Sequence, residues 1–182
     1  MPHRLFVAIR PPEPIRDRLV DTMEGIDNAR WQSDEQLHVT LRFIGEVERP
    51  QADDLALALA RIDAAAFALE IAGVGAFQRS RHLRSRAHAV WAALKPSDAL
   101  EGLRLKVEQA CESAGLARET RRFVPHVTLA RIDRSTGPLG TWLMHWGTLA
   151  AEPWVVREFV LYESHLGRTG AHYEPVATYP LA

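Results

Sequence analysis

LHVTLRFIG at residues 37–45 is a run in which apolar side chains alternate with histidine, threonine and arginine, and a glycine ends it. This pattern predicts a β-strand over residues 37–44. The tetrad His-Val-Thr-Leu at residues 38–41 recurs at residues 126–129, 88 residues further along the chain. Because both copies lie in strand-like segments, we interpret them as an internal repeat and the chain as two related halves.

The spacing within each tetrad places its polar residues together. In a β-strand, residues i and i+2 point to the same face, about 6.6 Å apart along the chain. His38 and Thr40 therefore share one face of their strand, and His126 and Thr128 share one face of theirs. The valine and leucine of each tetrad turn to the opposite, buried face. If the two halves face each other, two imidazoles and two hydroxyls meet at the centre.

The rest of the chain mixes strands with helices. Hydrophobic periodicity predicts helices at residues 15–26, 50–62, 98–114 and 138–146, and further strands at 4–9, 67–77, 87–94, 124–132, 155–164 and 173–179. Two of the strand pairs are expected to form hairpins, which favours an α+β fold with antiparallel strands over a doubly wound parallel sheet. No linker rich in proline, glycine or serine divides the chain, so residues 1–182 are expected to form a single domain.

Composition narrows the class of protein. The chain has 182 residues, of which 47% are apolar and 25% charged, with a net charge of −1, as in ordinary globular proteins. No apolar run approaches the roughly 18 residues of a membrane span, and no signal-peptide pattern is present, so we expect a cytoplasmic protein without membrane contact. The single cysteine, Cys111, excludes an internal disulfide and a cysteine-based zinc site. The near-neutral charge argues against nucleic-acid binding over the whole surface and leaves a local basic cleft open.

Two histidines and two threonines on facing strands suit phosphodiester chemistry. One imidazole can act as a general base and the other as a general acid, because their pKa lies near neutral pH. Hydroxyl groups can donate hydrogen bonds to phosphate oxygens. Phosphodiester cleavage requires these functions together, and a strained 2′,3′-cyclic phosphate can be opened by water without a metal.

The chain resembles the two-histidine phosphoesterase superfamily, whose signature is a pair of H-x-T-x motifs in tandem lobes. Within it, the sequence is most similar to the bacterial and archaeal RNA 2′,3′-cyclic phosphodiesterases, also described as 2′-5′ RNA ligases. The similarity spans most of the chain in the family's order. The matching stretches are residues 4–9 (RLFVAI), 38–47 (HVTLRFIGEV), 123–131 (FVPHVTLAR) and 161–164 (LYES), followed by Gly170 and Tyr173.

This resemblance implies an α+β bilobal phosphodiesterase domain over residues 1–182, with two pseudo-symmetric antiparallel sheets facing a central cleft, helices outside and one motif in each lobe. It also implies hydrolysis of RNA 2′,3′-cyclic phosphate ends to 2′-phosphates without metal or cofactor. By analogy His38 is the proton donor and His126 the proton acceptor, although the near-symmetric halves leave that assignment open. Thr40, Thr128 and Arg131 are expected to bind the phosphate.

Strict alternation also predicts which face of the strand is occupied by the residues that follow each tetrad. It places Arg131 on the face opposite His126, so a bulge, the end of the strand or a long side chain must bring it into the cleft. It places Arg42 on the face of His38, as a weak candidate, and it favours burial of Phe43. Together with Trp31, Phe43 is nevertheless a candidate for stacking a base.

Several alternatives remain open from the sequence. The same site suits reversible 2′-5′ RNA ligation, hydrolysis of a small cyclic nucleotide, or a module that binds RNA ends without turnover. The basic segment at residues 78–86 is either a grip for an RNA backbone or, as we favour, a solvated loop. The other six histidines lack partners at metal-ligand spacing. We expect RNA with a cyclic phosphate end or a cyclic nucleotide as the partner, and a monomer.

Overall fold

A computed structural model describes residues 1–77 and 89–182. Its helices are α1 (Glu13–Val20), α2 (Arg49–Ala60), α3 (Asp98–Ser113) and α4 (Gly140–Trp146), with a 3₁₀ turn at Asp34–Gln36. Its strands are β1 (His3–Ile9), β2 (Arg30–Trp31), β3 (Val39–Val47), β4 (Phe67–Leu69), β5 (Ile71–Phe77), β6 (Ala89–Leu94), β7 (His126–Arg131), β8 (Trp154–Val156), β9 (Glu158–Gly167) and β10 (Gly170–Pro180). The predicted α+β class is confirmed.

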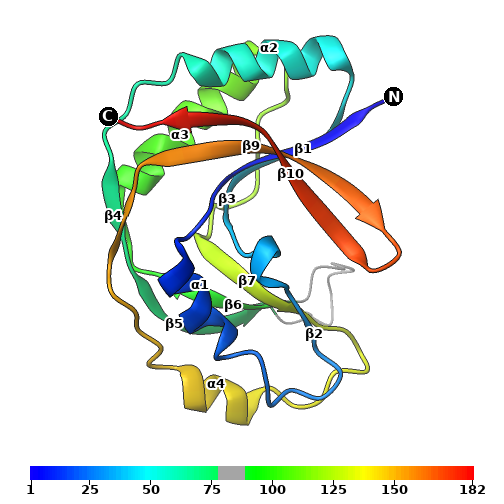
Figure 1. The fold of residues 1–182 in the computed structure, drawn as a ribbon, viewed down its shortest axis with the longest axis vertical. Coiled ribbons are helices and arrows are strands. Elements are labelled where there is room, and N and C mark those ends of the chain that lie inside the picture. The colour runs from blue at the N-terminus through cyan, green and yellow to red at the C-terminus, as the bar shows by residue number, and fades with distance from the viewer. Residues whose placement is uncertain (78–88) are drawn as a thin grey trace.

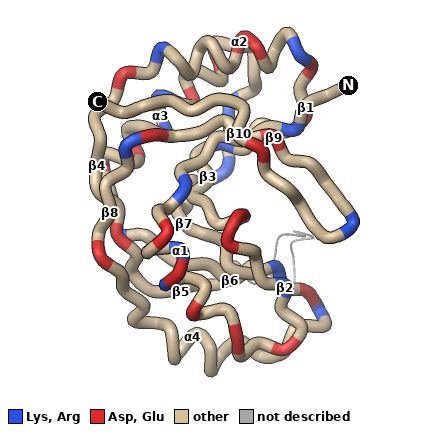
Figure 2. Tube along the Cα trace, in the orientation of Figure 1, with Lys and Arg blue, Asp and Glu red and all other residues tan. Residues whose placement is uncertain are grey.

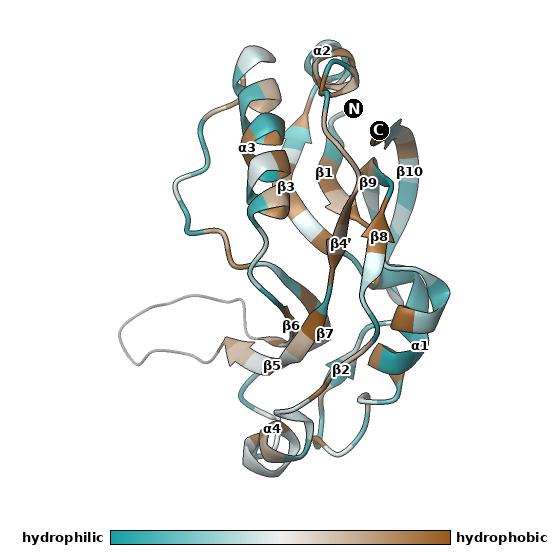
Figure 3. Ribbon diagram, turned by 90° about the vertical axis from the view of Figure 1, so that its left-hand side faces the viewer, coloured by the Kyte–Doolittle hydropathy of each residue, from teal (hydrophilic) through white to brown (hydrophobic). Residues whose placement is uncertain are grey.

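The two tetrads lie where the halves of the main sheet meet. The strand order is β10-β9-β1-β3-β7-β6-β5, with β2 added alongside β7, and every pairing is antiparallel. Strands β3 and β7 pair through one residue pair, Val39 with Val127, so the sheet consists of two halves joined at the tetrads. Strands β4 and β8 form a separate two-stranded sheet. Helices α2 and α3 lie at one end of the molecule and α4 at the other, with the strands between them (Figures 1 and 3).

The alternation predicted within the tetrads sets which face of each strand is buried. Val39, Leu41, Val127 and Leu129 all belong to the large apolar core and are at most 4% exposed. Helix α3 contributes its own apolar face to this core. It begins at Ser97, whose side chain accepts a hydrogen bond from the Leu100 amide at 3.1 Å, as expected of an N-cap residue. Burial of one tetrad face leaves the histidine and threonine face free for chemistry.

Both tetrad strands contain a β-bulge at the tetrad leucine. On β3, Thr40 pairs with Ala8 and Arg42 with Val7, so Leu41 between them has no partner residue on β1. On β7, Thr128 pairs with Trp91 and Ala130 with Val90, so Leu129 is likewise the extra residue. A bulge of this kind shifts by one residue which side chains face each side of the sheet.

Three expectations about element boundaries were wrong. The helix predicted over residues 15–26 ends at Val20, because the chain turns at Thr22, whose buried hydroxyl donates to the Leu19 carbonyl at 2.7 Å. The single strands predicted at 67–77 and 155–164 are each divided in two, because β4 and β8 pair with each other before the chain enters the main sheet. Among the described residues, no helix is long and apolar enough to cross a membrane.

Candidate active site

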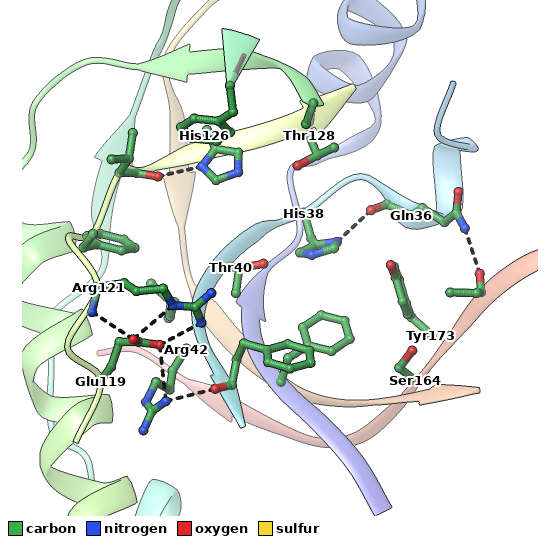
Figure 4. A pocket seen from close by; sticks show the side chains of 18 of the residues that line it. Gln36, His38, Thr40, Arg42, Glu119, Arg121, His126, Thr128, Ser164 and Tyr173 are labelled. Atoms are coloured by element: carbon green, nitrogen blue, oxygen red, sulfur yellow. Dashed lines mark hydrogen bonds and ion pairs between the residues drawn. The ribbon is translucent and has the colours of Figure 1, made fainter. Parts of the chain in front are cut away.

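A cleft of about 490 Å³ opens at the junction of the two sheet halves. The five residues singled out in the sequence, His38, Thr40, His126, Thr128 and Arg131, all line it. Figure 4 shows the two histidine–threonine pairs facing each other, one pair from each half of the sheet. The structure therefore brings together side chains that lie 88 residues apart in the sequence.

The two histidines are held by the same bond. His38 Nδ1 lies 2.7 Å from the Gln36 carbonyl oxygen, and His126 Nδ1 lies 2.6 Å from the Val124 carbonyl oxygen. Because a carbonyl oxygen can only accept, both Nδ1 atoms carry a proton and donate it. Each imidazole therefore has Nε2 as the nitrogen that can take or give a proton in the cleft. The sequence tetrads gave no sign of these bonds, whose acceptors lie two residues before each histidine.

Aromatic rings flank each imidazole. The His38 ring lies 4.9 Å from the Phe6 ring and 5.3 Å from the Tyr173 ring, measured between centroids. The His126 ring lies 5.2 Å from the Phe77 ring and 5.8 Å from that of Trp91. These contacts restrict rotation of the imidazoles and remove water from their faces.

Burial changes the protonation of both histidines. It lowers the pKa of His38 from 6.5 to about 4, the Gln36 carbonyl bond offsets part of that change, and the nearby positive charges lower it further. Burial also lowers the pKa of His126, and the charge of Arg131 adds to the effect. In the free protein both imidazoles are therefore neutral at neutral pH. An anion bound between them reverses the charge effect.

The bulge at Leu129 brings Arg131 into the cleft. Beyond the bulge, Ala130 is fully buried in the core, and Arg131 pairs with Ala89 and is exposed at the cleft. Strict alternation predicts Arg131 on the face opposite His126. The bulge interrupts the alternation and turns Arg131 to the cleft face. The charge of Arg131 lies close enough to lower the pKa of both His38 and His126.

The bulge at Leu41 has the same effect in the first half and overturns the expectation that Phe43 is buried. Phe43 was expected in the core, yet it pairs with Phe6, is 39% exposed and lines the cleft. The guanidinium of Arg4 lies 5.2 Å from the centroid of its ring. Arg42 was expected on the cleft face with His38, and it does line the cleft, although its backbone pairs with core residue Val7 and only 10% of its side chain is exposed.

Arg42 forms a network of hydrogen bonds and an ion pair within the protein. Its Nε donates to Glu108 Oε2 at 2.9 Å, and its Nη1 donates to the Phe43 carbonyl at 3.0 Å. Only 10% of the Arg42 side chain and 9% of the Glu108 side chain are exposed. Glu108 in turn accepts from the backbone amide of Glu119 at 2.8 Å. Arg42 therefore joins β3 to α3 and to the segment that leads into β7.

That segment contains cleft residues that the sequence analysis missed. Arg121 forms a two-bond pair with Glu119, Nε to Oε1 at 3.1 Å and Nη2 to Oε2 at 3.0 Å. These bonds from Arg121 hold the pKa of Glu119 at about 2. Arg121, Arg122 and Glu119 all line the cleft. The three arginines within residues 118–122 were the available signal, but a segment without periodicity gives no facing direction.

Uncharged polar side chains form another part of the cleft lining. Gln36 Nε2 donates to the Ala171 carbonyl at 2.8 Å, which fixes the 3₁₀ turn against β10 beside Tyr173 and Ser164 (Figure 4). Trp31, a candidate for base stacking, packs instead against Trp142 with ring centroids 6.1 Å apart, and it is absent from the described lining of the cleft. The basic segment at 78–86 lies outside the described residues.

Within residues 1–77 and 89–182, no three histidine, cysteine, aspartate or glutamate side chains form a group suited to a metal ion. Acidic and basic residues are interspersed along the chain (Figure 2), so the local charge of the cleft is set by its own lining.

Comparison with known proteins agrees with this site. The model of the LigT-like phosphoesterase family matches residues 9–86 and 93–173. An RNA 2′,3′-cyclic phosphodiesterase of Aeropyrum pernix is 37% identical over 144 residues, which cover 78% of this chain and 80% of that protein. One from Geobacillus stearothermophilus is 32% identical over 163 residues, 88% of this chain, and the match spans only 50% of that longer protein.

A solved structure extends the similarity to the whole fold. The crystal structure of Escherichia coli LigT complexed with 3′-AMP superposes with a TM-score of 0.79 at 28% sequence identity. The superposition covers 100% of this chain and 99% of that one. The family match covers both tetrads and most of the residues between them. The chain therefore belongs to the LigT-like phosphoesterase family.

Proposed function

We propose that this protein hydrolyses RNA 2′,3′-cyclic phosphate ends to 2′-phosphates by general acid–base catalysis between two histidines, without a metal ion. The observation that carries the proposal is the pair of imidazoles on facing sides of one cleft. Each is held by a hydrogen bond from Nδ1 to a backbone carbonyl, 2.7 Å long for His38 and 2.6 Å for His126. The names of the Aeropyrum and Geobacillus relatives, both RNA 2′,3′-cyclic phosphodiesterases, point to the same substrate.

In the proposed reaction, Nε2 of His126 accepts a proton from water as the water oxygen attacks phosphorus. The bond between phosphorus and the 3′ oxygen breaks, and Nε2–H of protonated His38 gives its proton to that leaving oxygen. The hydroxyls of Thr40 and Thr128 and the guanidinium of Arg131 donate hydrogen bonds to the non-bridging oxygens as negative charge develops on them. The phosphate remains on the 2′ oxygen.

The lowered pKa of His38 bears on this assignment. In the free protein burial disfavours protonation of both imidazoles, and it lowers the pKa of His38 to about 4. Taken alone, a pKa of about 4 disfavours His38 as the acid, whereas analogy with the family favours it. A bound phosphate anion raises the pKa of both groups, so the order in the complex decides the roles.

The decisive experiment is incubation of an RNA ending in 2′,3′-cyclic phosphate with the protein in excess EDTA, followed by location of the phosphate. We expect a 2′-phosphate. A 3′-phosphate overturns the proposed bond cleavage, and activity that requires added zinc or manganese overturns the metal-free mechanism. Binding without turnover supports an RNA-end-binding module instead. Joining of a second RNA with a free 5′-hydroxyl end supports 2′-5′ ligation.

A further inference from the structure

The lining of the central cleft carries an excess of positive charge. Among the described residues that line it, arginines outnumber acidic residues by six to two: Arg4, Arg42, Arg104, Arg121, Arg122 and Arg131 against Glu108 and Glu119. Glu108 is neutralised by its ion pair with Arg42. A single cyclic phosphate carries one negative charge, which is fewer charges than this lining can balance.

The cationic groups lie on two sides of His126. Strand β7 runs from His126 to Arg131, and Arg131 lies near its far end beside Ala89. Arg121 and Arg122 precede the strand, and in Figure 4 Arg121 lies below His126, close to Glu119, whereas Thr128 lies to the right of His126. Along the chain, the second tetrad is therefore flanked by the 121–122 arginine pair before it and by Arg131 after it, and all three arginines line the cleft.

The Arg121 guanidinium is held in place before any ligand binds. A chain of alternating charges leads to it from the protein interior: Glu108, Arg42, Glu119 and Arg121. The links are 2.9 Å from Arg42 to Glu108, 3.6 Å from Arg42 to Glu119 and 3.0 Å from Arg121 to Glu119. Although the Arg121 side chain is 76% exposed, two of its bonds go to Glu119, and its remaining N–H groups are free to face the cleft. Arginine orients its donors well for phosphate, since its fork is planar.

Arg122 adds a second cation at the same place. It is exposed, it lines the cleft, and no carboxylate lies within ion-pair distance of it among the described residues. An uncompensated guanidinium beside an oriented one forms a site for a second anion.

We propose that the 121–122 arginine pair binds the phosphate attached to the 5′ carbon of the terminal nucleotide, which in RNA is the phosphodiester to the preceding nucleotide. The proposal rests on the proposed function, because it assumes that a 2′,3′-cyclic phosphate lies between the histidines. In such a nucleotide the two phosphates lie on opposite sides of one ribose ring. The arginine pair then makes the protein select an RNA end over a free cyclic nucleotide.

The test compares three substrates: adenosine 2′,3′-cyclic phosphate, its 5′-phosphorylated form, and the dinucleotide ApA ending in a 2′,3′-cyclic phosphate. For the wild-type protein, kcat/KM is expected to be about tenfold higher for each of the last two than for the first. This ratio should fall toward one in R121Q/R122Q, and it should shrink with added salt. Arg118→Gln is the matched control, because Arg118 lies in the same segment and pairs with Glu112, outside the cleft lining. It should leave the ratio unchanged.

Each other outcome overturns a defined part of the proposal. An unchanged ratio in R121Q/R122Q shows that the pair does not bind the 5′ phosphate. An equal loss on all three substrates shows that the pair serves the scissile phosphate. A gain confined to the 5′-monophosphate overturns binding of an RNA chain. If the wild-type protein hydrolyses none of the three, the proposed function fails, and the same ratio measured as Kd by calorimetry decides whether the subsite exists.

Discussion

The two tetrad strands have the same tetrad and the same bulge, and their side chains differ beyond it. In each, a histidine is fixed through Nδ1, a threonine faces the cleft, and a bulged leucine shifts the residues beyond it. After the bulge the first half has Arg42, which is paired with Glu108 at the edge of the cleft, and then Phe43, whereas the second half has buried Ala130 and then Arg131 at these places. The two halves therefore share the direction of corresponding side chains, and they differ in which residues occupy the positions after the bulge.

The histidines are the part of the comparison expected to be equal. His38→Ala and His126→Ala should each reduce kcat by at least about 10²-fold, because one supplies the acid and the other the base of a single displacement. The double variant should lose far less than the product of the two losses. Turnover of a cyclic-phosphate RNA measures this, with His145→Ala, exposed on α4, as the control. A near-normal rate for either variant removes its histidine from the chemistry.

The two arginines sharpen the difference between the halves. Arg42→Met should reduce the free energy of unfolding by about 3–5 kcal/mol, because it leaves Glu108 buried without its partner. Arg131→Met should leave that free energy within about 0.5 kcal/mol of wild type and reduce kcat/KM. Urea titrations and kinetics on both variants separate the effects.

A second variant checks the cause of the Arg42 effect. Replacing both partners, in R42M/E108L, should recover part of the lost stability, because neither charge is then buried alone. The opposite pattern, a stable Arg42→Met protein and an unfolded Arg131→Met protein, contradicts the inference that Arg42 stabilises the fold and that Arg131 acts on the substrate.

The threonines test whether the facing pairs act together. Thr40→Val and Thr128→Val should each reduce turnover by about 10- to 100-fold, because each removes one hydrogen bond to a charged oxygen worth roughly 1.5–3 kcal/mol. Valine keeps the β-branched shape, so the fold is retained. Thr141→Val, at an exposed position on α4, is the control. Unchanged kinetics in both cleft variants means that the hydroxyls do not contact the phosphate.

The smallest expected effect is a shift in the pH profile. Burial disfavours the charged imidazolium, so both limbs of the kcat/KM bell should lie below pH 6.5, the ordinary pKa of histidine. The substrate anion favours that charged form, so the limbs of kcat should lie about one pH unit or more higher. The two limbs belong to the coupled pair. Removing the acid should remove the alkaline limb, which under our assignment occurs in the His38 variant. Its loss in the His126 variant instead reverses the roles.

The sequence predicted the elements that depend on a local pattern. The tetrads, their buried valine and leucine faces and the meeting of four polar side chains follow from alternation and repetition. The bulges could not be predicted, because a leucine at 41 or 129 is compatible with either register and only the partner strand selects one. That selection decided the positions of Phe43, Arg42 and Arg131. The Nδ1 bonds and the orientation of Arg121 depend on carbonyl and carboxylate groups that only the folded chain brings near.

The Nδ1–carbonyl bonds also govern how the proton moves through a catalytic cycle. Because each imidazole exchanges protons through Nε2 alone, one hydrolysis under the proposed mechanism leaves His126 charged and His38 neutral, the mirror image of the starting state. The protein after turnover is therefore poised for the reverse reaction, and it becomes ready for a new hydrolysis only when a proton has returned from one ring to the other. Solvent must carry that proton, so each turnover ends with a proton exchange between water and the two Nε2 atoms once product leaves.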